Sequence, residues 1–136
     1  MRRFMCIFGL LLPFAARADT SKGEHLAYTV GCVNCHHQTD KHIINAPPLV
    51  IVKGYSLPQF RALMKTGMTS TGRDLVAQHS VMGFVAKEQF AHFSDDEVAA
   101  LYDYLTHDWT AQKGIEEEKK IPFYFPQLQG KGHSSP

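Results

Sequence analysis

The sequence has no long apolar run, no strong excess of charge and few cysteines. Its 136 residues carry 14 lysines and arginines against 13 aspartates and glutamates, a formal net charge of +1. This balance argues against nucleic-acid binding, which needs a clustered basic face. No segment reaches the roughly 18 consecutive apolar residues of a membrane span. The three cysteines, Cys6, Cys32 and Cys35, are an odd number and a poor basis for a disulfide framework.

Several other patterns are missing as well. The chain has no internal repeat and no low-complexity tract. No Ser/His/Asp set, phosphate-binding loop or pair of carboxylates stands out as a catalytic site. No segment alternates polar and apolar residues convincingly, as a half-buried strand would. The length allows one domain with a modest core.

Residues 1–18 have the features of a secretory signal. Arg2 and Arg3 precede a short apolar run, and Ala16-Arg17-Ala18 is a small-x-small cleavage site. We expect cleavage between Ala18 and Asp19 and a mature protein in the periplasm. Cleavage would remove three of the 14 basic residues, leaving 11 against 13 acidic ones, and would leave a single pair of cysteines.

Local signals predict an all-α protein with three to four short helices and long loops. Gly31 and Gly67 predict the ends of the first two helices, and apolar spacing carries the third to about Thr106. Residues 37–55 and 69–85 are predicted to be loops, and residues 108–136 a C-terminal extension that is mostly irregular. Three capping boxes mark the helix starts: Ser21 with Glu24, Ser56 with Gln59, and Ser94 with Glu97.

The segment from Cys32 to His36 reads Cys-Val-Asn-Cys-His, the Cys-x-x-Cys-His pattern through which a c-type haem is attached. Thiols at this spacing can each reach one vinyl group of a porphyrin, and the adjacent His36 is directed at the iron as proximal ligand. A redox disulfide would follow a strand instead of a helix, and a zinc site would need two further ligands. One haem attached through Cys32 and Cys35 would also fill the core of a loop-rich chain that otherwise buries little.

The other axial position of such a haem has several candidate ligands. Met64 lies on the apolar face of a predicted helix and is interpreted as a core residue, and Met68 lies in a polar turn. Met82 lies in a predicted loop, where its thioether would close the haem pocket and raise the reduction potential relative to two imidazoles. His79, three residues earlier, is the main rival. We favour Met82 and keep Met68 and His79 as alternatives.

Together these motifs resemble a monohaem class I c-type cytochrome of bacterial type, and in particular the cytochrome subunits of membrane-associated dehydrogenases. The resemblance runs from about residue 23 to residue 105. It covers Gly-Glu-x-Leu-Ala before Gly-Cys-x-x-Cys-His, then Ala-Pro-Pro-Leu, Leu-Met-Lys-Thr-Gly, Gly-Arg, Val-Met and Phe-Ser-Asp-Asp-Glu-Val-x-Ala-Leu-Tyr-x-Tyr-Leu. It implies a small cytochrome c-like fold over residues 19–107, with the methionine before the last helix, here Met82, as distal ligand.

The resemblance also implies roles for residues outside the motif. The carbonyl of Pro47 would accept a hydrogen bond from the second nitrogen of His36 and hold the ring, and Leu49 would belong to the haem-binding set. Gly23 and Ala27 would let the first helix approach the last one closely, against Leu101 and Tyr104. Ordinary amphipathic packing predicts nearly the same contacts, so both interpretations of Gly23 and Ala27 stay open.

The expected function is one-electron transfer and not catalysis. Two filled axial positions leave no open site for oxygen activation. We expect an electron-accepting cytochrome subunit of a periplasmic dehydrogenase or reductase complex, whose redox partners are proteins such as a dehydrogenase or an oxidase. The mature chain has no transmembrane segment of its own, while association with a membrane complex stays open. The alternatives are a free soluble carrier and a haem sensor with a labile distal methionine.

Charge is distributed unevenly along the chain. Between residues 41 and 93 the basic residues outnumber Asp74 and Glu88, and from Ser94 to Glu118 the acidic residues dominate. A dipole of this kind would steer a weak and fast encounter with a partner, but a solvated surface with unbalanced helices explains it equally. The basic residues are Lys41, Lys53, Arg61, Lys65, Arg73 and Lys87.

Overall fold

The computed structural model describes residues 19–36 and 46–120. In this part the protein is all-α, as predicted, and the only extended pairing is a single bridge between Met68 and Asp74. The elements in chain order are α1 (Thr20–Thr29), α2 (Cys32–Cys35), η1 (Leu49–Gly54), α3 (Leu57–Thr66), α4 (Val81–Glu88), η2 (Phe90–His92), α5 (Asp95–Asp103), η3 (Tyr104–Asp108) and α6 (Ala111–Lys120).

Two of the three predicted capping boxes are present. Ser56 and Gln59 cap α3 reciprocally, Ser94 and Glu97 do the same for α5, and Gly67 ends α3 with the positive φ of 77° that a glycine tolerates best. The first box is wrong. Helix α1 is capped by Asp19, whose carboxylate accepts hydrogen bonds from the backbone N–H groups of Ser21 and Lys22. Ser21 itself lies inside the helix.

The structure has more helices than the predicted three to four. Six α-helices lie in residues 19–36 and 46–120. Of these, α4 begins in a segment predicted to be a loop, and α6 lies in the extension predicted to be irregular. The 3-10 helix η1 also forms in a segment predicted to be a loop. Residues 111–120 pack on α2 and η1, so the described domain continues past the predicted boundary at residue 107. The remainder of the extension, residues 121–136, lies outside the described residues, as does the predicted signal, residues 1–18.

The central packing contact is the crossing of α1 and α5. A Cβ on Gly23 would lie 2.1 Å from the carbonyl oxygen of Ala100 and 2.8 Å from the Cβ of Tyr104, so only a glycine lets the two helices come this close. Ala27 is fully buried beside it, as is Leu101. The close approach of the first predicted helix to the one that carries Leu101 and Tyr104, expected at Gly23 and Ala27, is therefore present between α1 and α5.

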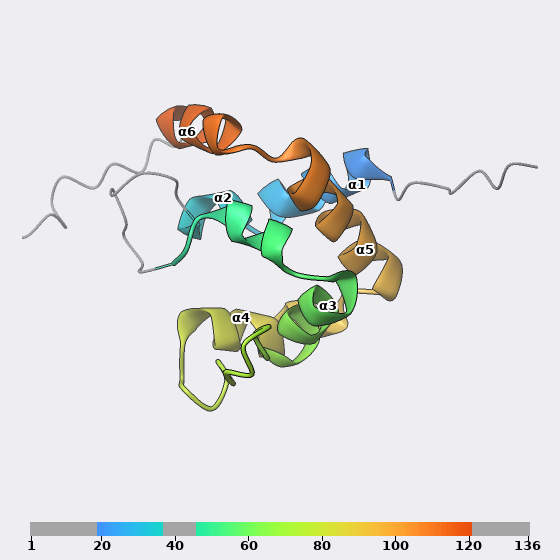
Figure 1. Cartoon of the computed structure of the whole chain (residues 1–136), viewed down its shortest axis with the longest axis vertical. Coiled ribbons are helices and arrows are strands. Elements are labelled where there is room, and N and C mark those ends of the chain that lie inside the picture. Colours follow the sequence, from blue (N-terminus) through green and yellow to red (C-terminus); the bar gives the residue numbers. More distant parts are fainter. Residues whose placement is uncertain (1–18, 37–45, 121–136) are drawn as a thin grey trace, which may run out of the picture.

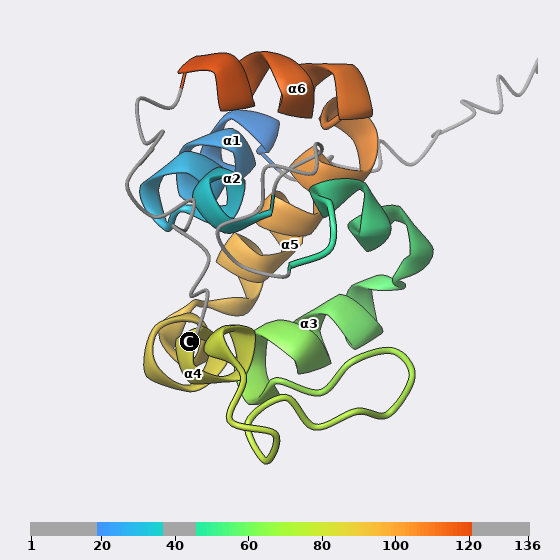
Figure 2. The ribbon, with the colours of Figure 1, turned by 90° about the vertical axis from the view of Figure 1, so that its left-hand side faces the viewer.

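Helix α5 lies between two groups of helices. In Figures 1 and 2, α1, α2 and α6 lie on one side of it and α3 and α4 on the other. The shared core includes Val98, Leu101, Tyr104 and Leu105 from α5 and η3, and Trp109 from the segment before α6. The indole N–H of Trp109 is buried and has no acceptor among the described residues. No helix in the described part of the chain is long and apolar enough to cross a bilayer.

Candidate functional site

The two cysteines of the motif lie on one short helix. Gly31 has a φ of 76° and ends α1, and α2 then forms a single turn from Cys32 to Cys35 with His36 directly after it. Both thiols are half-buried, and the two are not joined in a disulfide. The two cysteines thus begin and end one helical turn, and His36 follows as its C-terminal cap residue.

The Cys32 thiol is not set up as a nucleophile. Burial raises the pKa of this thiol to about 12, so it stays protonated at neutral pH. Catalytic thiols of redox Cys-x-x-Cys pairs have lowered pKa values instead. A helix, α1, precedes the pair, where a redox motif of this kind follows a strand. Both observations argue against a thiol–disulfide oxidoreductase.

The imidazole of His36 is held by the backbone of a distant segment. Its Nδ1 lies 2.6 Å from the carbonyl oxygen of Pro47. Because a carbonyl oxygen only accepts, Nδ1 carries the proton, and in the neutral ring Nε2 is left with the lone pair that binds a metal. Two residues on, Leu49 is buried in the same core cluster as Val33 of α2. The Pro47 carbonyl therefore lies beside the motif, and Leu49 belongs to the core that Val33 also joins. Neither residue has a role that its local sequence alone would reveal.

Met82 is in the first turn of a helix instead of the predicted loop. Helix α4 begins at Val81, after Ser80, whose hydroxyl accepts a hydrogen bond from the backbone N–H of Gly83. The Met82 side chain is half-buried and packs against the same core cluster as Cys32. In Figure 2, α4 belongs to the lower group of helices and α2 to the upper one, so the two candidate iron ligands come from opposite sides of α5.

The rival ligands differ from Met82 in their surroundings. Met64 is buried in the core, as the helical spacing predicted. Met68 is half-buried and paired through its backbone with Asp74. His79 is exposed and has a φ of 52°, a left-handed conformation that is uncommon for a residue with a side chain. Of Met68, His79 and Met82, it is Met82 that packs against the hydrophobic core cluster.

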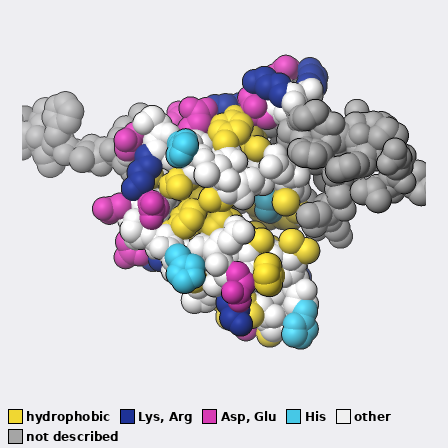
Figure 3. All heavy atoms as spheres, turned by 180° about the vertical axis from the view of Figure 1, so that it is seen from behind, with side chains coloured by type: hydrophobic (Ala, Val, Ile, Leu, Met, Phe, Trp, Pro, Cys, Tyr) yellow, Lys and Arg dark blue, Asp and Glu magenta, His cyan; other side chains and the backbone are white. Residues whose placement is uncertain are grey.

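Large apolar side chains are exposed on the two elements next to the candidate ligands. Ile51 of η1 is 47% exposed, and Val81 and Phe84 of α4 are 54% and 65% exposed. Figure 3 shows hydrophobic side chains gathered across the middle of one face of the molecule. Thiols, an imidazole and a thioether, the side chains of Cys32, Cys35, His36 and Met82, are donor types that a c-type haem uses.

Helix α6 covers the motif helix from outside. It packs on α2, and its Lys113 forms an ion pair of 2.8 Å with Glu24 of α1. The same ammonium group lies 4.9 Å from the centre of the Tyr104 ring, whose hydroxyl is 3.3 Å from the Glu24 carboxylate. Gly114 is buried in this interface. The sequence analysis did not predict this contact, because it expected residues 108–136 to be mostly irregular.

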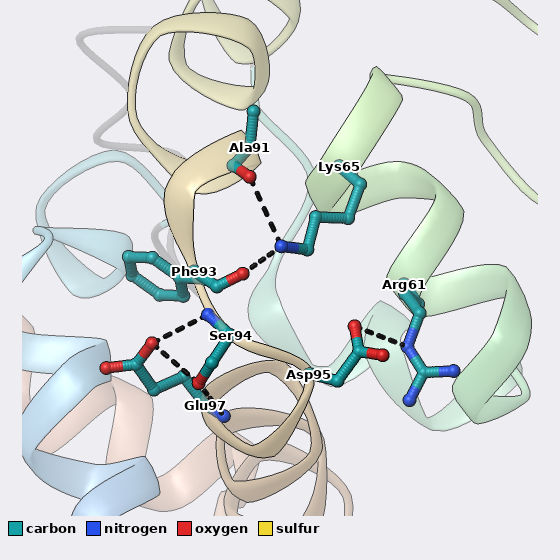
Figure 4. A network of polar contacts seen from close by, with 7 residues as sticks. All are labelled: Arg61, Lys65, Ala91, Phe93, Ser94, Asp95 and Glu97. Carbon is teal, nitrogen blue, oxygen red and sulfur yellow. Dashed lines mark hydrogen bonds and ion pairs between the residues drawn. The ribbon is translucent and has the colours of Figure 1, made fainter.

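Two of the basic residues considered for docking have internal partners (Figure 4). The Lys65 ammonium donates to the carbonyl oxygens of Ala91, at 3.2 Å, and Phe93. Arg61 lies 3.3 Å from the carboxylate of Asp95. These contacts join α3 to the start of α5, so Lys65 and Arg61 contribute to the fold, and the proposed basic surface is smaller than the sequence suggested.

A zinc site has no support in the described residues. Residues 19–36 and 46–120 contain no group of three or more His, Cys, Asp or Glu side chains that could hold a metal ion.

Comparison of the chain with protein-family models, with curated proteins and with solved structures finds no match. The functional interpretation therefore depends on the motif and on the geometry around it.

Proposed function

We propose that the protein is a monohaem c-type cytochrome with a cytochrome c-like fold that transfers single electrons in the periplasm. When bound, the haem supplies reversible Fe(III)/Fe(II) chemistry. The single observation that carries the proposal is the 2.6 Å hydrogen bond from His36 Nδ1 to the Pro47 carbonyl. It orients the imidazole of the histidine that follows Cys35 and puts the proton on Nδ1, so that Nε2 carries the lone pair that an iron ligand needs, as expected for a metal-binding histidine with an outer partner.

Each residue of the site has a defined task in this proposal. The thiols of Cys32 and Cys35 would hold the haem covalently, each by addition of its S–H across one vinyl group. His36 would be the proximal ligand and Met82 the distal one. The Pro47 carbonyl would hold the His36 ring, and Leu49 would contribute to the apolar surroundings. With both axial positions filled, the protein supplies a site from which water is excluded and where the oxidation state changes without loss of a ligand.

The test is haem attachment in a host that exports the chain and carries c-type maturation enzymes. We expect haem that stays bound under denaturing conditions, and its loss in a Cys32→Ser/Cys35→Ser variant. Cys6→Ser is the matched control, because Cys6 lies outside the motif, and it should retain the haem. Wild-type protein without covalent haem would overturn the proposal, as would a double variant that retains it.

The distal ligand is tested in the same material by optical spectroscopy. We expect the ferric protein to show the weak far-red band of a thioether–iron bond and Met82→Ala to lose it. Met68→Ala and His79→Ala should keep the band. A Met82→Ala variant with an unchanged band would show that Met82 is not the ligand. Rapid carbon monoxide binding to the reduced protein at neutral pH would favour a sensor with a labile methionine.

We further propose that the protein is the electron-accepting subunit of a dehydrogenase or reductase complex, with a free periplasmic carrier as the alternative. The extension, residues 108–136, would be the docking strap. Because α6 packs on α2 and η1, the deletion that leaves this packing in place is that of residues 121–136. Deleting these residues should slow electron transfer from the partner enzyme if they form a docking strap. An unchanged rate and affinity would favour the free carrier.

A further inference from the structure

The first turn of α4 lies directly against a peptide group of the segment before it. A Cβ built on Gly83 would be 2.2 Å from the carbonyl oxygen of Leu75 and 2.6 Å from the backbone nitrogen of Val76. Both are backbone atoms, so no change of rotamer could relieve the contact. The end of α3 meets the same point, since a Cβ on Gly67 would lie 2.9 Å from Val76 Cγ2 and 3.7 Å from Gly83 Cα.

Ser80 joins the same peptide group to the start of the helix. Its backbone N–H and its hydroxyl both donate to the Leu75 carbonyl oxygen, at 3.1 and 3.0 Å. The hydroxyl oxygen in turn accepts from the backbone N–H of Gly83, at 3.0 Å. The carbonyl of Leu75 thus holds Ser80, and Ser80 holds the first turn of α4, in addition to the close contact at Gly83.

Asp74 stabilises the segment that carries this carbonyl. Its carboxylate accepts hydrogen bonds from the backbone N–H groups of Val76 and Ala77, at 2.9 and 3.0 Å. The N–H of Leu75 donates to the carbonyl of Gly67, at 3.0 Å. The peptide group against which Gly83 packs is therefore hydrogen-bonded to the end of α3, which restricts its movement away from Gly83.

Met82 lies between the two residues that make these contacts. We propose that Gly83 and Ser80 are positioning residues that fix the Met82 thioether at the iron. This inference rests on the proposed haem function. A Cβ at 2.2 Å must move to ordinary contact, a shift on the order of 1 Å, which exceeds the roughly 0.5 Å within which a functional group must be held. A neutral thioether competes poorly with imidazole once its geometry is lost.

The first test is Gly83→Ala in the haem-loaded protein, read by the far-red thioether band and by imidazole binding to the ferric iron. We expect the band to be lost and imidazole to bind at least about tenfold more tightly, because methionine no longer occupies the position for most of the time. Two controls accompany it. Gly54→Ala adds a methyl group where nothing lies within 4 Å, and Gly23→Ala adds one that meets the Ala100 carbonyl oxygen at 2.1 Å.

The Gly23→Ala control separates positioning from general destabilisation. It creates a backbone clash of the same kind, but at the crossing of α1 and α5 and away from α4. We expect it to lower the unfolding temperature while the folded fraction keeps the band and the wild-type imidazole affinity. The reduction potential should follow the band, falling in Gly83→Ala and staying unchanged in both controls.

Ser80 provides a test that introduces no clash, in case Gly83→Ala does not fold. Ser80→Ala removes the hydroxyl that bridges Leu75 and Gly83, and we expect imidazole to bind about fivefold more tightly, the equilibrium effect of losing an N-terminal cap. Ser80→Thr keeps a hydroxyl and should restore the wild-type affinity. A merely structural role for Ser80 would lower stability in Ser80→Ala without changing imidazole affinity.

The outcomes are distinguishable from failure of the proposed function. Wild-type protein without covalent haem would contradict the function itself. Covalent haem with a thioether band that survives in Gly83→Ala, or an imidazole affinity in Ser80→Ala equal to that of wild type, would overturn the positioning role and leave the haem function intact. Covalent haem without a thioether band in the wild type would overturn the inference in the same way.

Discussion

His36 and Pro47 are eleven residues apart in sequence and joined by a hydrogen bond of 2.6 Å between Nδ1 and the backbone carbonyl. The acceptor is a main-chain atom, so no side-chain substitution deletes it, and only the conformation of residues 46–48 can move it. Pro48 helps to fix that conformation, because a proline restricts the residue before it to extended geometry. The orientation of the His36 ring thus depends on two consecutive proline residues.

Pro47→Ala should loosen this carbonyl without removing it. We expect a loss of about 0.4–1 kcal/mol in the free energy of unfolding, the usual effect of releasing a proline, and a change in reduction potential with covalent haem retained. Pro58→Ala is the control, since Pro58 lies in the first turn of α3 and is exposed. It should show a similar loss of stability and no change in potential by voltammetry. Equal potentials in both variants would contradict a role for Pro47 in orienting His36.

Lys65 should act as a structural cation and not as part of a docking surface. Lys65→Met keeps the aliphatic stem but leaves the carbonyls of Ala91 and Phe93 without their donor. We expect urea unfolding to show a loss of about 1–3 kcal/mol. Lys87→Met, on the exposed side of α4, should change stability by less than about 0.5 kcal/mol. If Lys87→Met alone slowed the partner reaction, docking would be assigned to α4 and not to α3.

The Lys113–Glu24 pair should make stability depend on pH in the acid range. The hydrogen bond from Lys113 is the main cause that holds the pKa of the Glu24 carboxyl below its ordinary value of 4.5. A lowered folded-state pKa contributes stability that is present above pH 4.5 and is lost as the pH falls through the folded-state pKa. Because both side chains are partly exposed, the contribution is about 0.2–1 kcal/mol.

Urea unfolding of Lys113→Met between pH 7 and pH 3 measures this contribution. We expect the difference from wild type to shrink towards low pH, with a remainder of about 0.5–1 kcal/mol from the contact of Lys113 with the Tyr104 ring, which does not titrate in this range. Glu24→Gln should lose only the part that depends on pH. Lys53→Met, for which the structure shows no ion pair among the described residues, should match wild type at every pH. A constant difference for Lys113→Met would rule out the ion pair as a source of stability.

Two truncations should separate α6 from the residues after it. Deleting 111–136 removes the packing of α6 on α2 and η1, whereas deleting 121–136 leaves it in place. We expect the longer deletion to cost about 1–3 kcal/mol more in thermal or urea unfolding than the shorter one. It should also expose the Cys32 and Cys35 thiols of haem-free protein to a thiol reagent more quickly. Identical stability and thiol reactivity in the two proteins would show that α6 does not cover the motif.

Helix ends were predictable where the signal is local. The boxes at Ser56 and Ser94 were identified because cap and partner lie within four residues and no neighbour competes. At the start of α1 two such signals overlap. The carboxylate of Asp19 accepts hydrogen bonds from the backbone N–H groups of Ser21 and Lys22 in the first turn. The Ser21 hydroxyl therefore does not cap the helix. Which of two neighbouring residues caps a helix depends on the backbone geometry at its first turn, and a sequence motif does not specify that geometry.

Helix α4 and the role of its glycine were not predictable from local sequence. The residue three positions after Ser80 is Gly83, not a glutamate or glutamine, so no capping box is present. The reason for that glycine is the carbonyl of Leu75, eight residues away, which only the folded chain brings into contact. The motif from Cys32 to His36 predicts the chemistry. Pro47 was indicated by the resemblance to a cytochrome, because no pattern within residues 37–55 distinguishes it.

The packing of α6 on α2 also has a consequence in time. Chains leave the ribosome, and an exporter, with the N-terminal end first, so Cys32 and Cys35 emerge 79 and 76 residues before the first residue of α6. During that interval the thiols face solvent or any maturation enzyme with nothing laid over them. The interval ends when α6 packs on α2. If the motif is modified as proposed, this order gives a maturation enzyme access to the thiols before α6 covers them.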